Sequence, residues 1–366
     1  MRSKTPDHPS SASIFLICFA SGVLFIILQV SLIIFYIDPF QFFRVASGTP
    51  YFSQSMQRNQ HAGIIRNYPF DSIIIGNSAG AMFEPSMFDA YSPKIEVQNL
   101  IFNGGTVNEN VILLKSVLQY KELKVVFWNV NGQQFEGYRW PTFPNCMYQQ
   151  AWKYFPYCYL LNVDVLREAV ALKSIYLKPF SEGAWVKHID RFQQYVPMPL
   201  DRAELSCQLQ TKLARGRTNN ILSFDDDSAL DQRSVRDFES LIASVVRDNP
   251  KVKFVFYFPP LYVPFFWQSV GKTEMQFRLY IKRRLLQFAN VELYEFQAMT
   301  DVTHDVTKYR DSAHYYREVA QEMANDFASG RYRVTESRLR SGWDALVGEL
   351  EVGHAIAQSE FKDLCH

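Results

Sequence analysis

The sequence predicts an α/β fold with a parallel sheet that helices cover on both faces, preceded by one membrane-spanning helix. Strands are expected at five short apolar runs rich in β-branched and aromatic residues: 71–76, 94–100, 124–130, 252–258 and 291–296. Helices are expected where apolar residues recur every three or four positions between these runs: 108–122, 231–249 and 273–290. Strands that alternate with helices are typical of parallel sheets.

The predicted membrane span is an uncharged stretch of 24 residues from Ile14 to Ile37. A helix rises 1.5 Å per residue, so this stretch is long enough to cross a ~30 Å hydrocarbon layer. A cleaved signal peptide has a shorter apolar centre and a small-residue cleavage site, which is missing here, so we expect a retained anchor. Because Arg2 and Lys4 precede the span and Asp38 follows it, the positive-inside rule places the tail in the cytoplasm and the remainder outside it.

The charge balance argues against a nucleic-acid partner. Lys and Arg number 38 against 37 Asp and Glu, and no dense basic run occurs. The five cysteines have no clustered spacing with histidine, so no metal site and no cofactor are expected. Cys18 lies in the predicted span, while Cys146 and Cys158 could pair in an oxidising compartment.

These patterns divide the chain into four segments: a cytoplasmic tail at 1–13, the anchor at 14–37, an α/β domain at 38–330 and a helical extension at 331–366. The α/β pattern is interrupted at about 136–230, which we interpret as an insertion. The insertion opens with a cluster of aromatic residues: Trp140, Tyr148, Trp152, Tyr154 and Tyr157. Such a cluster could stack on sugar rings, although packing in a core or lid is the more common role of aromatic clusters.

The first predicted strand ends in Gly-Asn-Ser-Ala-Gly, with Ser78 at its centre. Ligands bind at the carboxyl edge of parallel sheets, so a hydroxyl group there could be a nucleophile, a phosphate contact or a helix cap. A serine needs a base within hydrogen-bond reach, and the base needs a carboxylate to orient it, before it can act as a nucleophile.

Two Asp-x-x-His pairs near the end of the α/β pattern could supply that base and carboxylate. Asp311 and His314 directly precede an amphipathic helix, so we expect them at the same sheet edge as Ser78. Asp301 and His304 are followed by a loop-like segment, and solvated surface residues are the simpler interpretation of this first pair.

A tetrahedral intermediate also needs hydrogen-bond donors for its oxyanion. Gly104 and Gly105 follow the second predicted strand, where missing side chains expose backbone N–H groups. Asn131 lies just past the third strand and is the better amide candidate, because Asn129 is expected inside the strand. Gly-Gly and Asn-Gly are also ordinary turn sequences, so the order of these residues matters more than each one alone.

Taken in chain order, these motifs resemble those of the SGNH (GDSL-like) hydrolase superfamily. More narrowly, the chain resembles membrane-anchored bacterial SGNH-like proteins related to the alginate O-acetyltransferase and DltD-like groups. The resemblance runs from about Ile14 to Phe327 and rests on four segments: Asp38–Phe40 after the span, Phe70–Ser78, Pro259–Pro260 and Tyr309–Tyr315.

The resemblance implies a flavodoxin-like, three-layer α/β/α fold in which Ser78 is the nucleophile and His314 the base that Asp311 orients. It also implies an oxyanion hole formed by the Ser78 N–H, the Gly104 or Gly105 N–H, and Asn131. Asn77 departs from the Asp, Thr or Ser common before the serine. An α/β-hydrolase is disfavoured, since its acid is well separated from its histidine, whereas here the two are three residues apart.

The function implied is that of a membrane-anchored O-acyltransferase or O-acyl esterase acting on a cell-envelope or exported polysaccharide through an acyl-Ser78 intermediate. The expected location is the bacterial inner membrane, with one span and the catalytic domain outside the cytoplasm, where an acyl-transfer or secretion complex is a further expected partner. Two alternatives remain: a non-catalytic scaffold that binds polysaccharide or secretion partners, and a lipase whose apolar cleft is lined by "PPLYVPFFW" (259–267).

Overall fold

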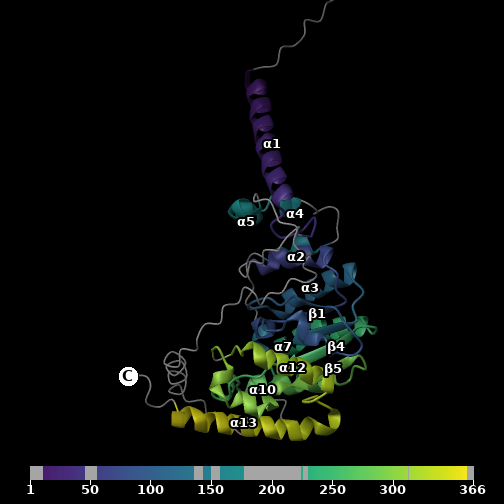
Figure 1. The fold of residues 1–366 in the computed structure, drawn as a ribbon, viewed down its shortest axis with the longest axis vertical. Coiled ribbons are helices and arrows are strands. Elements are labelled where there is room, and N and C mark those ends of the chain that lie inside the picture. The colour runs from purple at the N-terminus through teal and green to yellow at the C-terminus, as the bar shows by residue number, and fades with distance from the viewer. Residues whose placement is uncertain are drawn as a thin grey trace, which may run out of the picture. The chain divides into compact units, whose positions relative to one another are not determined.

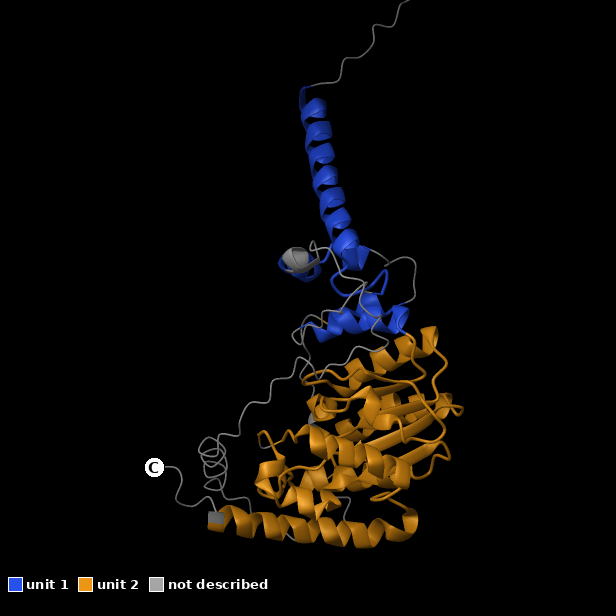
Figure 2. Ribbon diagram, in the orientation of Figure 1, with its two compact units in different colours: residues 1–68, 144–186 blue, residues 69–143, 187–366 orange. Residues whose placement is uncertain are grey.

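The computed structural model describes residues 11–45, 56–135, 143–149, 157–176, 224–225, 230–311 and 313–360. The chain forms two compact units, of which the first combines residues 1–68 with 144–186 and the second combines 69–143 with 187–366 (Figure 2). The predicted α/β domain at 38–330 is therefore shared between the units, because its first residues cluster with part of the predicted insertion.

The first unit contains the predicted anchor, helix α1 (Ser11–Ile37), which is long and apolar enough to cross a membrane and is the one such helix among the described residues (Figure 1). It also contains α2 (Gln57–Asn67), α4 (Tyr157–Leu160) and α5 (Val163–Tyr176). Its short 3-10 turn at Asn145–Tyr148 is joined to α4 by a disulfide between Cys146 and Cys158, as the sequence allowed.

Two residues of the predicted aromatic cluster fall on described parts of the first unit. Tyr148 is buried and donates a hydrogen bond of 2.5 Å from its hydroxyl group to the Arg58 carbonyl oxygen, so it packs in the core. Tyr157 is exposed. Trp140, Trp152 and Tyr154 lie outside the described residues.

The second unit is built on a five-stranded parallel sheet of order β2-β1-β3-β4-β5, and each strand lies within one of the five predicted runs. The strands are β1 (Ser72–Ile75), β2 (Val97–Asn99), β3 (Val125–Asn129), β4 (Lys253–Phe258) and β5 (Val291–Glu295). Nearly every strand residue is buried, which explains why the runs are continuously apolar rather than alternating. In this order the chain reverses direction across the sheet between β1 and β3, the point at which open α/β sheets bind ligands.

The helices that cover the sheet agree with the predicted segments to within a few residues. They include α3 (Val107–Tyr120), α10 (Lys272–Leu285) and α12 (Arg317–Ser329). The predicted helix 231–249 is formed by α7 (Gln232–Asp237), a π-helical turn (Phe238–Ala243) and α8 (Ser244–Asp248) in succession. Three further helices are α9 (Val263–Ser269), α11 (Thr300–Thr303) and α13 (Leu339–Glu360), the last being most of the predicted extension.

One core of the second unit gathers aromatic rings around Phe327 on α12. The rings of Phe127, Tyr257 and Phe296 lie 5.2, 5.4 and 5.2 Å from it, centroid to centroid. Since these three residues come from β3, from β4 and from the segment directly after β5, this packing fixes α12 on one face of the sheet. The turn that carries the predicted base leads directly into α12, so the core also positions that turn.

Candidate active site

Ser78 opens a 3-10 turn (Ser78–Gly80) three residues after β1 ends, at the carboxyl edge of the sheet. Gly76 makes the sharp exit from the strand possible, because its φ of +131° is a conformation that other residues rarely adopt. A Cβ atom at position 76 would lie 1.9 Å from Oδ1 of Asn129. The Asn77 side chain then caps the turn by accepting the Ala79 N–H at 3.1 Å.

Two buried asparagines from the following elements hold this turn. Asn129, the last residue of β3, accepts the Asn77 N–H through Oδ1 at 2.9 Å and donates from Nδ2 to the Asn77 carbonyl oxygen at 3.2 Å. Asn110 on α3 accepts the Gly76 N–H at 2.9 Å. Gln134 in turn donates to Oδ1 of Asn129 at 2.9 Å. The backbone on the N-terminal side of Ser78 is thus held from β3 and α3.

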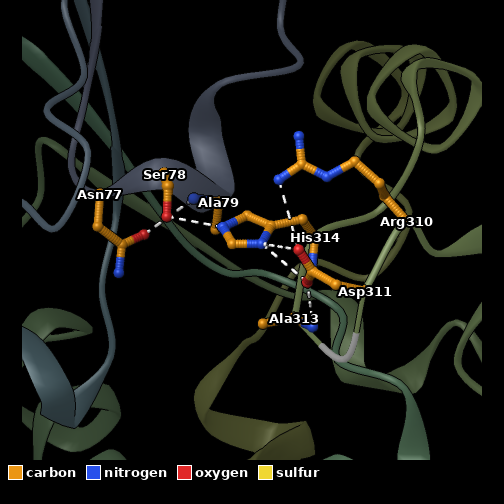
Figure 3. Close-up of polar contacts among 7 residues, drawn as sticks. All are labelled: Asn77, Ser78, Ala79, Arg310, Asp311, Ala313 and His314. Carbon is orange, nitrogen blue, oxygen red and sulfur yellow. Dashed lines mark hydrogen bonds and ion pairs between the residues drawn. The ribbon is translucent and has the colours of Figure 1, made fainter. Parts of the chain in front are cut away.

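The structure brings Ser78, His314 and Asp311 together in one hydrogen-bonded chain (Figure 3). Nε2 of His314 lies 2.8 Å from Oγ of Ser78, and Nδ1 lies 2.8 Å from both carboxylate oxygens of Asp311. Asp311 also accepts the backbone N–H groups of Ala313 and His314 at 2.9 Å each, so acid and base belong to one tight turn.

Tyrosines at both ends of the histidine turn fix its position. Tyr309 and Tyr315 form an antiparallel bridge that closes the turn, and the Arg310 N–H donates to the His314 carbonyl oxygen at 2.8 Å. The buried hydroxyl group of Tyr315 donates to the carbonyl oxygen of Ala79, the residue after Ser78. Tyr315, which follows His314, is therefore hydrogen-bonded directly to Ala79, which follows Ser78.

The surroundings of Asp311 keep it ionised. Burial by itself raises the pKa of its carboxyl group, but the hydrogen bond and charge of His314 and the two turn amides outweigh burial and hold the pKa well below its usual range. A carboxylate that stays anionic at neutral pH stabilises a positive charge on the imidazole ring.

Ser78 and His314 line a cavity of about 890 Å³. Asn131 shares this wall, and its Oδ1 accepts the Gln134 N–H at 3.3 Å, which makes Nδ2 the end of the side chain that can donate into the cavity. The lining also includes apolar and charged residues of the segment that contains α9 and the start of α10, among them Leu261, Phe265, Lys272, Glu274 and Arg278.

Neither Gly104 nor Gly105 is among the residues that line the cavity. The Gly105 N–H donates to the Phe102 carbonyl oxygen at 3.0 Å, and a Cβ atom on Gly105 would lie 2.6 Å from the Gly76 carbonyl oxygen. Gly104 has a φ of +59°. The turn and the close packing against the strand exit account for Gly105, whose N–H already has a partner. A place for the Gly104 N–H in an oxyanion hole stays a prediction.

The alternative pair, Asp301 and His304, does not line the cavity. Asp301 is exposed on α11, and Nε2 of His304 lies 2.7 Å from a carboxylate oxygen of Glu349 on α13. Within the described ranges, no three His, Cys, Asp or Glu side chains are grouped closely enough to hold a metal ion.

Sequence reasoning missed the residues that position the site rather than those that could react. Asn110 had a usable signal, since it stands in the first turn of a helix capped by Thr106 and Glu109, next to the sheet edge. Glu274 had no such signal in the sequence. It lies on α10, 142 residues after Gly132, and its carboxylate accepts the Gly132 N–H at 2.8 Å. No protein-family model matches the chain, and comparison with curated proteins finds no relative.

Proposed function

We propose that this protein is a membrane-anchored serine O-acyltransferase or O-acyl esterase that acts through an acyl-Ser78 intermediate. The observation that carries the proposal is the hydrogen-bonded chain from Ser78 through His314 to Asp311, with 2.8 Å at each link, at a cavity beside the carboxyl edge of the sheet. Nucleophile, base and orienting carboxylate at these distances are the arrangement that serine acyl transfer requires.

In the proposed reaction, Nε2 of His314 takes the proton from Ser78 as Oγ attacks the carbonyl carbon of an ester. The resulting oxyanion accepts hydrogen bonds from the Ser78 N–H and from Nδ2 of Asn131. The C–O bond of the ester then breaks, and the leaving alcohol takes the proton from His314. Asp311 stabilises the imidazolium ion that exists between these two proton transfers.

The second half of the reaction repeats these steps with a new hydroxyl compound. His314 removes a proton from water or from a sugar hydroxyl group, whose oxygen attacks the acyl-Ser78 carbonyl carbon. Collapse of the second tetrahedral intermediate breaks the bond to Oγ, and His314 returns the proton to Ser78. Water as the acceptor gives an esterase, and a sugar hydroxyl group gives a transferase.

We further propose that the second unit is an SGNH-type domain. The support is the position of each motif: Ser78 three residues after β1 ends, Asn131 two residues after β3 ends, and the Asp311/His314 turn before α12. The strand order is also that of flavodoxin-like sheets, which the resemblance implies.

A polysaccharide is the proposed acyl acceptor or substrate. The cavity is several times larger than an acetyl group requires and combines carboxylates, of Asp231 and Glu274, with the apolar side chains of Leu261 and Phe265. Carboxylates can accept hydrogen bonds from sugar hydroxyl groups, and apolar side chains can pack on sugar rings. The apolar anchor α1 fits an enzyme that works on polymers of a bacterial cell envelope, on the outer side of the inner membrane.

Intact-mass spectrometry tests the acyl-enzyme directly. We expect the full-length protein in detergent to gain about 42 Da, the mass of one acetyl group in place of hydrogen, after incubation with 4-nitrophenyl acetate. Ser78→Ala should gain nothing. Ser269→Ala is the matched control, since Ser269 also lines the cavity but donates to the Phe265 carbonyl oxygen at 2.7 Å, and it should be acetylated like the wild type. Equal labelling of wild type and Ser78→Ala would rule out Ser78 as the nucleophile.

A further inference from the structure

Helix α5 exposes apolar side chains that a protein surface in water would normally cover. Val163 is 68% exposed and Val170 is 59% exposed, and Leu161 and Tyr157 just before the helix are close to half exposed. Val163 and Val170 are seven residues apart and therefore lie on the same face of the helix. The opposite face, with Val165 and Ala169, is fully buried.

Helix α5 packs at the end of α1. The side chains of α1 are exposed along most of its length, and the covered ones are in the last turns, where Ile34 is fully buried. Both α4 and α5 contact α1, and Figure 1 shows α5 beside the C-terminal end of α1, viewed along its own axis. The exposed apolar side chains of α5 therefore lie on a helix that packs beside the end of the predicted span.

The length of α1 sets the depth of α5. A hydrocarbon layer of ~30 Å corresponds to about 20 helical residues, so a span that starts at Ile14 leaves the hydrocarbon near Ile34. Since Ile34 is at the covered end of α1, α5 lies level with the boundary between hydrocarbon and lipid headgroups.

The charged residues of α5 suit this depth. Burying Asp164, Arg167 and Glu168 in hydrocarbon would cost free energy, whereas the polar headgroup layer can solvate their charges. Arg167 also forms an ion pair with Asp164 at 3.0 Å. The exposed aromatic rings of Tyr36 on α1 and Tyr157 add the residue type that is enriched at membrane interfaces.

The turn after α1 holds this arrangement rigid. The carboxylate of Asp38 accepts the backbone N–H groups of Phe42, Phe43 and Arg44 at 2.8, 3.0 and 3.1 Å. It also accepts the Tyr159 hydroxyl group at 2.9 Å, which joins the end of α1 to α4. Because α5 contacts both α1 and α4, this network also holds α5 at the end of the span.

We propose that the segment 157–171 is an interfacial anchor that lies in the headgroup layer at the end of α1, with the lipid bilayer as its partner. The exposed face of Val163 and Val170 packs among the upper acyl chains, and Arg167 meets lipid phosphates. This second membrane contact is independent of the chemistry proposed for Ser78, and it stops the first unit from swivelling about a single helix.

Depth-dependent fluorescence quenching tests the proposal on the full-length protein in liposomes of phosphatidylcholine and phosphatidylglycerol. All labelled variants carry Cys18→Ser, Cys207→Ser and Cys365→Ser and keep the Cys146–Cys158 disulfide. Single cysteines then replace Val163, Val170 or, as a reference for the bilayer centre, the exposed Leu24, and each carries an environment-sensitive NBD label. Because all three side chains are exposed, the labels disturb no core.

Labels at positions 163 and 170 should emit at shorter wavelength than NBD on free cysteine in buffer. Nitroxides on headgroups or high on the acyl chain should quench them at least twofold more than nitroxides near the chain end, and the label at position 24 should show the reverse order. The proposal is overturned if labels at 163 and 170 emit as in buffer and neither nitroxide quenches them. It is equally overturned if their depth order matches that of position 24, which would place α5 inside the hydrocarbon.

Discussion

The side chain of Asn129 pairs with both polar groups of the Asn77 backbone, accepting its N–H at 2.9 Å and donating to its carbonyl oxygen at 3.2 Å. Asn77, the residue before the proposed nucleophile, is therefore bound to the last residue of the neighbouring strand β3. The two bonds resemble a strand pairing in which the Asn129 side chain replaces the backbone. The Tyr315 hydroxyl group holds Ala79 on the other side of Ser78. The position of Ser78 is therefore fixed by hydrogen bonds from outside its own turn.

Asn129→Ala should lower kcat for ester hydrolysis by about 100-fold, because loss of both hydrogen bonds lets the serine move out of line with His314. It should also lower the free energy of unfolding by about 1–3 kcal/mol, since the Asn77 backbone groups lose their partner. Steady-state kinetics and urea unfolding measure the two effects. A variant with wild-type kcat would show that the serine turn holds its shape without Asn129.

Asn131→Ala tests the proposed oxyanion donor separately from Asn129, which positions the serine turn. Removal of one oxyanion donor typically costs about 100-fold to 1,000-fold in kcat, and we expect that loss here with KM little changed. Stability should stay close to that of the wild type, since the Asn131 side chain accepts only one long hydrogen bond, of 3.3 Å, within the loop. If kcat is unchanged, the oxyanion is bound by other donors.

Tyr315→Phe removes one hydroxyl group from a fully buried ring and leaves the shape of the core unchanged. The Ala79 carbonyl oxygen loses its hydrogen bond, which should cost roughly 0.5–1.5 kcal/mol in unfolding free energy. Because the bond joins the serine turn to the histidine turn, the rate of Ser78 acetylation should fall as well. Tyr309→Phe is the matched control: the ring of Tyr309 is equally buried, but its hydroxyl group makes no hydrogen bond to the serine turn, and acetylation should keep its wild-type rate.

Asp311→Asn should reveal the pH dependence of this carboxylate in stability. Its folded pKa lies well below the unfolded value of about 3.9, so the ionised group stabilises the folded state above that pH. This contribution is lost as pH falls through the lower folded pKa. Urea unfolding should therefore show wild type more stable than Asp311→Asn at pH 7 and a smaller difference at pH 3. A difference that is independent of pH would contradict the lowered pKa.

Glu295 is the centre of a buried ion cluster behind the cavity wall. Its carboxylate lies 2.5 Å from the Lys282 amino group and 3.0 Å from Nε of Arg278, and Arg278 also lines the cavity. Glu295→Gln leaves two buried cations without their counter-charge, which should cost about 3–5 kcal/mol in unfolding free energy. Adding Lys282→Met should restore part of that loss, and a double variant no more stable than the single one would contradict this account.

Chain order and local periodicity were enough to predict the five strands, the long apolar helix α1, and the residues that meet at the sheet edge. A strand that is buried on both faces is apolar throughout, and parallel strands all end at the same edge. The sequence alone therefore predicts that Ser78 and the Asp311/His314 turn lie close together. Asp311 and His314 form most of their contacts within one turn, and short-range geometry of this kind can be inferred from sequence.

Polar groups that pair across the fold could not be predicted in the same way. Gly105 was a plausible oxyanion donor until the structure showed its N–H bonded to Phe102, and Asn129 looked like an ordinary strand residue until its side chain was seen to hold Asn77. The first unit likewise joins distant parts of the chain, as in the hydrogen bond of Tyr159 with Asp38. Periodicity reports which face of an element is buried, whereas the partner of each buried donor depends on which segments the sheet order places side by side, and only the tertiary structure decides that.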